Sequence, residues 1–215
     1  MTVSGDYLTP HLNGLPYFEK PPLFYWLQSG VIKCLGLSEF SMRLLPVLTG
    51  LLGLILTYIV ASHFVNRRTG LISAAVLGTS FLYFSLSRMI VLDLLFAFLM
   101  AVSMWSFVKG VLSTGKSRLY SALACSLFLA LALLTKGLVA LVIFFSVTIL
   151  WLLITNSFSR LKPLYFVPCL LLFLLVAAPW HVFVSLENPE FFNFYFIREH
   201  FLRYTTKMHV RYQPI

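Results

Sequence analysis

Long stretches without a charged side chain constrain this sequence more than any other feature. No Asp, Glu, Lys or Arg occurs in residues 44–66, 69–87, 119–135, 137–159 and 163–186, and Asp93 is the single charge in residues 89–108. A helix that crosses the hydrocarbon core of a bilayer needs about 20 mainly apolar residues. The windows therefore predict six spans, over residues 43–65, 70–88, 91–109, 118–135, 137–156 and 163–185.

The composition excludes an ordinary soluble domain. The 215 residues are 60% hydrophobic and only 11% charged, whereas about 25% of the residues of a soluble domain are charged. So little charge would leave large apolar patches facing water. We therefore expect an all-α, polytopic helix bundle in a membrane, forming one domain over residues 1–215. Cys34, Cys125 and Cys169 lie far apart and indicate neither a disulfide framework nor a metal cluster.

The segments that join the spans alternate in charge. One side carries seven basic residues and no acids: Arg67, Arg68, Lys109, Lys116, Arg118, Arg160 and Lys162. The other side carries the remaining nine basic residues and all seven acids. Purely basic short loops are typical of the cytoplasmic side, although the raw Lys and Arg count favours the other side. With six spans, residues 1–42 and 186–215 then share the outer face. We expect Glu19, Lys20, Arg88, Asp93, Lys136, His200 and Arg203 to reach that face.

The stretch "NGLPYFEKPPLFYWL" is the first candidate for chemistry. Pro21 and Pro22 suit the start of a helix, and residues 23–37, with their aromatic side chains, indicate a short interfacial helix. Lys20 could contact a phosphate, and Glu19 could contact a metal ion or a hydroxyl group. The alternative is a lysine that snorkels to the interface beside a solvated glutamate.

Two further stretches place charges at the outer face. In "SRMIVLDLLFAF", Asp93 could cap a helix N-terminus, or it could belong to a site, since acids beside apolar runs are costly; Arg88 would favour its ionised form. In the aromatic segment "FFNFYFIREHFLRY", His200 and Arg203 would share a helical face. They could lie on anionic lipid headgroups, but on the outer face a phosphate-bearing ligand explains them better. Lys136, between two spans, could belong to the site or simply snorkel. We expect no nucleic-acid partner, because a basic cluster on the outer face of a membrane does not meet nucleic acid.

Four stretches together resemble a known family: "SGDYLTPHLNGLPYFEKPPLFYWL", "RLLPVLTGLLG", "SRMIVLDLLFAF" and "REHFLRY". In this order, they resemble the polyprenyl-phosphate sugar transferases, which include the lipid A aminoarabinose transferase and the protein mannosyltransferases. The resemblance implies a membrane glycosyltransferase of the GT-C fold in the bacterial inner membrane. Its donor would be a sugar on polyprenyl phosphate and its acceptor lipid A or protein, and both termini of this chain would be periplasmic.

The resemblance also implies roles for individual residues. Lys20 would contact the lipid phosphate, with Arg203 and Arg88 as further cations. Asp93 would be a catalytic acid. Glu19 and His200 would lie beside the acceptor, and both could hold a divalent metal ion, although no cofactor is certain.

The sequence departs from its relatives at both ends. Relatives have a further span and an outer-face acid before the "SGD" stretch, and that acid is the family's main catalytic candidate; here no acid precedes Asp6. Relatives also continue past residue 215. We therefore expect an N- and C-terminally truncated member that transfers no sugar by itself. The alternatives are a non-enzymatic protein that binds or transports lipid phosphates, and an inactive remnant.

Overall fold

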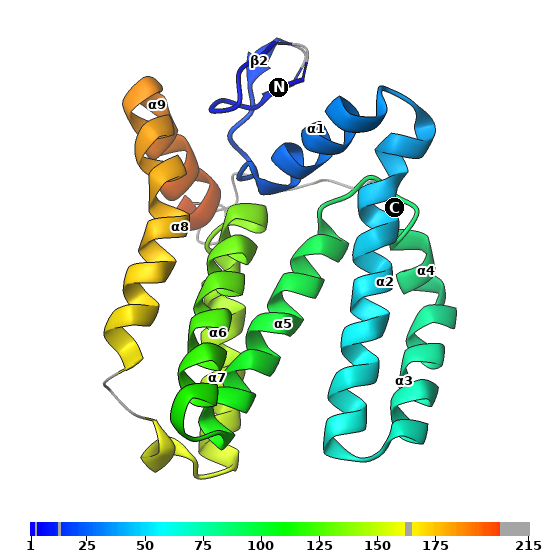
Figure 1. The fold of residues 1–215 in the computed structure, drawn as a ribbon. Helices are drawn as coiled ribbons and strands as arrows, with labels where there is room; N and C mark the ends of the chain where they lie inside the picture. Colours follow the sequence, from blue (N-terminus) through cyan, green and yellow to red (C-terminus); the bar gives the residue numbers. More distant parts are fainter. Residues whose placement is uncertain (3, 13, 162–164, 203–215) are drawn as a thin grey trace, which may run out of the picture.

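The computed structural model describes residues 1–2, 4–12, 14–161 and 165–202, with side chains up to residue 197. The longer helices are α1 (Leu23–Leu35), α2 (Glu39–Phe64), α3 (Arg67–Thr79), α5 (Asp93–Leu112), α6 (Gly115–Lys136), α7 (Val139–Ile154) and α8 (Phe166–Glu187). The shorter elements are β1 (His11–Leu12), β2 (Leu15–Pro16), α4 (Phe81–Leu86), η1 (Phe158–Arg160), α9 (Glu190–Phe192) and the π-helix η3 (Asn193–Leu202). Figure 1 shows a bundle whose upper end carries α1 and the β1–β2 hairpin.

The predicted all-α membrane bundle is confirmed. Four of the described helices, α2, α5, α6 and α8, are long and apolar enough to cross a membrane, and α7 is a shorter apolar helix of 16 residues. They largely coincide with the predicted spans 43–65, 91–109, 118–135, 163–185 and 137–156. The predicted interfacial helix over residues 23–37 corresponds to α1.

The predicted span 70–88 is not one continuous helix. Ser80 has an extended backbone, with φ −68° and ψ 133°, and separates α3 from α4. The hydroxyl groups of Thr79 and Ser80 donate to the carbonyl groups of Ala75 and Leu77, each at 2.8 Å. Such side-chain hydrogen bonds compete with the helical pattern of the backbone. Apolar composition alone does not reveal this break.

Polar residues set the ends of the helices. Ser38 and Ser41 form a capping box at the start of α2: the Ser38 hydroxyl accepts from the Ser41 N–H at 3.2 Å, and the Ser41 hydroxyl accepts from the Ser38 N–H at 3.0 Å. Asn66 caps α3 by accepting from the Thr69 N–H at 2.9 Å. Gly137 ends α6 with φ 88°, a backbone conformation that favours glycine. It allows α7 to begin only two residues later.

The best-buried packing lies between α5 and α6. Leu95 and Leu99 of α5 are buried with Leu129 and Leu133 of α6. The Ser103 hydroxyl of α5 donates to the Cys125 carbonyl of α6 at 2.9 Å. Small residues and interhelical hydrogen bonds of this kind let membrane helices approach closely. Many large apolar side chains of α2, α3, α7 and α8 are exposed instead, as expected for surfaces that face lipid.

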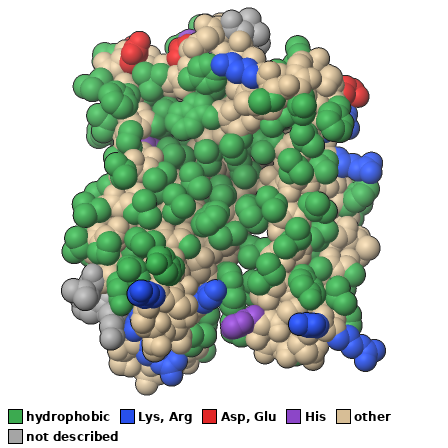
Figure 2. Space-filling view, in the orientation of Figure 1, with side chains coloured by type: hydrophobic (Ala, Val, Ile, Leu, Met, Phe, Trp, Pro, Cys, Tyr) green, Lys and Arg blue, Asp and Glu red, His purple; other side chains and the backbone are tan. Residues whose placement is uncertain are grey.

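The two ends of the bundle differ in charge. The connections α2–α3, α5–α6 and α7–α8 meet at one end, which we call the basic end; its charged side chains among the described residues are Arg67, Arg68, Lys109, Lys116, Arg118 and Arg160. All acids with described side chains lie at the opposite, mixed end: Asp6, Glu19, Glu39, Asp93, Glu187 and Glu190. Figure 2 shows acidic side chains only at the upper end of the visible face. The predicted Lys162 lies outside the described residues.

Candidate functional site

The N-terminal segment forms a tight turn at the mixed end. Gly5 has φ 72°, which favours glycine. The Asp6 carboxylate then accepts hydrogen bonds from the Leu8 and Thr9 N–H groups at 2.9 and 3.0 Å. The Thr9 hydrogen bond is the main cause that lowers the pKa of Asp6 below its ordinary value, against a smaller opposing effect of burial. His11 Nδ1 lies 3.8 Å from the other carboxylate oxygen.

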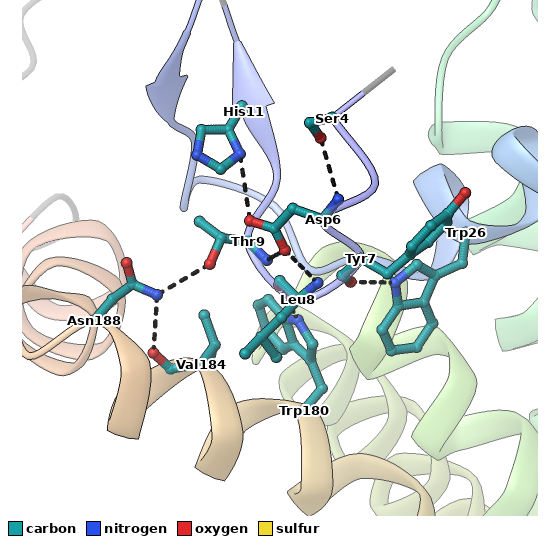
Figure 3. Close-up of polar contacts among 10 residues, drawn as sticks. All are labelled: Ser4, Asp6, Tyr7, Leu8, Thr9, His11, Trp26, Trp180, Val184 and Asn188. Atoms are coloured by element: carbon teal, nitrogen blue, oxygen red, sulfur yellow. Dashed lines mark hydrogen bonds and ion pairs between the residues drawn. The ribbon is translucent and has the colours of Figure 1, made fainter. Parts of the chain in front are cut away.

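Two tryptophan side chains connect this turn by hydrogen bonds to helices that are distant in the sequence (Figure 3). Trp26 of α1 donates its indole N–H to the Tyr7 carbonyl at 2.7 Å, and Trp180 of α8 donates to the Leu8 carbonyl at 2.9 Å. Asn188 adds a hydrogen bond to the Thr9 hydroxyl at 3.0 Å. Because a buried N–H group without a partner is costly, these contacts fix the position of the turn. We call Trp26 and Trp180 the tryptophan latch.

An aromatic cluster joins the first and last parts of the described chain. The ring of Phe18 meets Phe191 edge-on, with centroids 5.3 Å apart, and Phe191 stacks on Tyr195 at 5.0 Å. Trp180 contacts Phe191 at 5.4 Å. Burial raises the pKa of the Tyr195 hydroxyl. The two terminal segments therefore meet at the mixed end, as predicted, over the residues that the structure describes.

Glu19 and Lys20 follow directly after Phe18 and precede two fully buried prolines, Pro21 and Pro22. The Glu19 carboxylate is exposed and accepts from the Tyr17 hydroxyl at 3.2 Å. Lys20 is half-buried, and within the described part of the chain it forms no ion pair. The backbone at Glu19 and Lys20 is thus held on both sides, while the charged groups remain accessible.

A second charged group lies where α5 begins and α6 ends. Lys136 Nζ is 2.5 Å from Asp93 Oδ1 and 5.2 Å from the centre of the Phe96 ring. The Asp93 side chain is 48% exposed and that of Lys136 is 31% exposed. The start of α5 also offers the positive end of the helix dipole to Asp93. This ion pair connects two helices at the mixed end.

The cation in contact with Asp93 is Lys136 rather than Arg88, the residue expected to favour the ionised form of Asp93. Arg88 lies over the ring of Phe84, with its guanidinium carbon 4.4 Å from the ring centre. Phe84 is four residues earlier, so the end of α4 directs Arg88 back over its own helix. The signal for Lys136 in the sequence was a basic residue between two predicted spans, and the structure places it as the last residue of α6. Its pairing with an acid 43 residues earlier depends on tertiary structure.

The structure brings several predicted residues to one end of the bundle. Lys20 just before α1, Arg88 after α4, Asp93 at the start of α5 and Lys136 at the end of α6 all lie there (Figure 1). The side chain of His200 and the whole of Arg203 lie outside the described residues. For that reason the predicted metal pair of Glu19 and His200 stays a prediction. In the described part of the chain, no three His, Cys, Asp or Glu side chains form a group that could hold a metal ion.

Comparisons with known proteins match nearly the whole chain. A family model described as dolichyl-phosphate-mannose-protein mannosyltransferase matches residues 1–195. The undecaprenyl phosphate-alpha-4-amino-4-deoxy-L-arabinose arabinosyl transferase 1 of Proteus mirabilis is 32% identical over 100% of this chain and 39% of its own length. An uncharacterized protein of Aquifex aeolicus is 30% identical over 94% of this chain and 40% of its own length.

Solved structures agree with these matches. The crystal structure of ArnT from Cupriavidus metallidurans bound to undecaprenyl phosphate is similar, with a TM-score of 0.88, 31% identity and coverage of 96% of this chain. Its apo state gives a TM-score of 0.87 at 30% identity and 93% coverage of this chain. This chain covers 38% of the ArnT chain and 39% of the Proteus mirabilis relative. The similarity therefore concerns less than half of the length of these proteins.

Proposed function

This chain belongs to the dolichyl-phosphate-mannose-protein mannosyltransferase family, and from this premise we propose that it forms part of the membrane domain of a glycosyltransferase. Its donor would be a sugar linked to polyprenyl phosphate. Residues 1–215 would belong to a single GT-C transmembrane domain. The proposed location is the bacterial inner membrane, with the mixed end and both termini in the periplasm.

The proposed reaction is a substitution at the anomeric carbon of the donor sugar. A hydroxyl or phosphate oxygen of the acceptor forms a bond to this carbon, while the bond from the carbon to the phosphate oxygen breaks. Polyprenyl phosphate leaves with an additional negative charge. A fixed cation or hydrogen-bond donor beside such a developing charge can lower the barrier by about 3–4 kcal/mol. The proton of the acceptor has to pass to a base.

Lys20 is the proposed cation for the leaving phosphate. The observation that carries this assignment is its setting: buried Pro21 and Pro22 on one side and the Phe18–Phe191 contact on the other fix its backbone. Its ammonium group has no ion-pair partner in the described region and is half-buried at the membrane edge. A pre-positioned, unpaired cation is the requirement for binding a phosphate without reorganisation.

Asp93 is the proposed catalytic carboxylate. Lys136 contacts its Oδ1, and its 48% exposure leaves the group within reach of an acceptor. Arg88 and Arg203 are proposed as further phosphate contacts. Glu19 and His200 are proposed to line the acceptor side, where a divalent metal ion could bind.

The similar protein of Proteus mirabilis is named for 4-amino-4-deoxy-L-arabinose on undecaprenyl phosphate. We therefore propose an amino-pentose on undecaprenyl phosphate as the donor class. Lipid A and protein hydroxyl groups are the proposed acceptors.

Binding of undecaprenyl monophosphate to the purified chain in detergent tests the proposal. Lys20→Ala should weaken binding at least tenfold, because it removes the charge that faces the phosphate. Lys33→Ala is the matched control: Lys33 lies on α1, the helix that follows Lys20, and its ammonium group rests over the Tyr7 ring, 4.5 Å from the ring centre. Equal affinity of the Lys20→Ala variant and the wild type would remove Lys20 from the site.

A further inference from the structure

A large apolar cavity lies between α5, α6, α7 and α8, away from Lys20 and Asp93. Its volume is about 750 Å³, within the range of roughly 300–1,000 Å³ that is typical of ligand pockets. Phe107, Leu129, Phe144 and Phe173 are among its lining residues, one from each helix. The cavity is therefore large enough for hydrocarbon chains.

The cavity opens at the exposed surface of the bundle, which carries large apolar side chains. Phe145, Phe166 and Leu170 line it and are also 52%, 66% and 42% exposed. A lipid tail could thus enter sideways from the bilayer without crossing a polar surface. A water-soluble ligand would have to cross the hydrocarbon region to reach the same opening.

Among the described residues that line this cavity, Arg118 is the basic one. Arg118 lies in the first turn of α6, at the basic end, and is half-buried. Within the described residues it has no ion-pair partner, and the acids with described side chains all lie at the opposite end of the bundle. Tyr165, just before α8, also lines the cavity. An unpaired guanidinium beside hydrocarbon is costly and indicates an anionic partner.

We propose that this cavity binds an anionic phospholipid, with its acyl chains among the apolar side chains and its phosphate at Arg118. Basic pockets between membrane helices on the cytoplasmic side are known to bind anionic lipid headgroups. The guanidinium group of Arg118 and the apolar lining match the phosphate and the acyl chains of such a lipid. The proposal concerns a site at the opposite end from Lys20 and does not depend on the sugar-transfer reaction.

The test measures the affinity of the purified 215-residue chain for phosphatidylglycerol in detergent, by native mass spectrometry. Phosphatidylcholine with the same acyl chains serves as the comparison lipid. Arg118→Gln should weaken phosphatidylglycerol binding about fivefold, since a basic residue near anionic lipid contributes about 1 kcal/mol. Arg118→Lys should retain most of the affinity. Arg68→Gln, at the same end but outside the cavity, should bind as the wild type does.

A second variant tests whether the acyl chains of the phospholipid occupy the cavity. Ala122 lines the cavity, so Ala122→Phe should fill part of it and reduce the binding of phosphatidylglycerol, whereas Ala101→Phe on an exposed surface of α5 should not. Lys20→Ala should leave this binding unchanged, which separates the cavity from the proposed phosphate site. The proposal is overturned by equal affinity for the two lipids, by equal effects of Arg118→Gln and Arg68→Gln, or by Arg118-dependent binding of undecaprenyl monophosphate in place of phosphatidylglycerol.

Discussion

Asp93 and Lys136 form an ion pair between α5 and α6 at the mixed end. Both side chains are partly exposed at the membrane edge. Exposed ion pairs typically contribute about 0.2–1 kcal/mol to the free energy of unfolding. Their position at the mixed end, which also carries Lys20, therefore favours a role in the proposed site over a role in stability.

Replacing Lys136 should separate these two roles. We expect Lys136→Gln to lower the free energy of unfolding by less than about 1 kcal/mol. Binding of undecaprenyl monophosphate should fall several-fold, because a positive charge is lost while Asp93 remains. Thermal unfolding and binding titrations on the same preparation give both values. A large loss of stability with unchanged binding would make the pair a structural contact only.

The Asp6 turn should depend on pH. The pKa of Asp6 is lowered in the folded chain, mainly by the Thr9 N–H, so its stabilising effect is complete above the ordinary carboxyl pKa of about 4 and disappears as the pH falls through the lower folded value. Asp6→Asn should therefore be less stable than the wild type at pH 6, and the two melting temperatures should converge toward pH 3. Glu187→Gln removes an exposed acid and serves as control. A difference that stays constant across this range would contradict the prediction.

The helix positions predicted from the sequence agree with the structure where apolar composition alone determines the helix. Windows with no charged residue, or with Asp93 alone, located α2, α5, α6, α7 and α8, because apolar composition and length are sufficient for a membrane helix. The break at Ser80 was missed, because it depends on local hydroxyl hydrogen bonds inside an apolar window. The hairpin of β1 and β2 was also missed.

The candidate site, too, was predictable from the sequence only in part. The stretch around Glu19 and Lys20 was recognisable, because its charges and prolines are adjacent in the sequence. The partner of Asp93 was not, since Lys136 lies 43 residues away. The tryptophan latch was equally hidden: each indole finds a carbonyl group that only the folded bundle places beside it.

The capping box of α2 gives a prediction for a single element. Ser38→Ala removes the oxygen that accepts from the Ser41 N–H and should lower the free energy of unfolding by about 1 kcal/mol. Ser38→Asp keeps an acceptor and should retain most of the stability. Thermal unfolding in detergent measures both variants. Equal stability of Ser38→Ala and the wild type would show that water satisfies this helix end.

At the scale of the whole molecule, the separation of charge between the two ends determines how the bundle sits in a membrane. The basic end carries no described acid, which favours its placement in the cytoplasm. In the proposed orientation, the mixed end, with Lys20 and the Asp93–Lys136 pair, faces the periplasm. The proposed sugar transfer and the proposed phospholipid site would occupy opposite leaflets.

Cysteine labelling in cells tests this orientation. In a Cys34→Ser background, which removes the exposed native thiol, Glu19→Cys should react with a membrane-impermeant maleimide that has entered the periplasm. Lys116→Cys should react only after the inner membrane is opened. The reverse pattern would invert the proposed orientation, and labelling of both from one side would contradict the bundle topology itself.

The hydrogen bond from Trp180 to the Leu8 carbonyl joins residues 172 positions apart, and this has a consequence for biosynthesis. At ribosomal speeds of about 5–20 residues per second, roughly 10–30 seconds pass between the synthesis of the two partners. During that interval the N-terminal turn can be held only by contacts with earlier parts of the chain, such as those of Trp26 and Lys33 of α1 with Tyr7. The segment that carries Lys20 therefore receives its final shape late, after α8 has been translated and inserted.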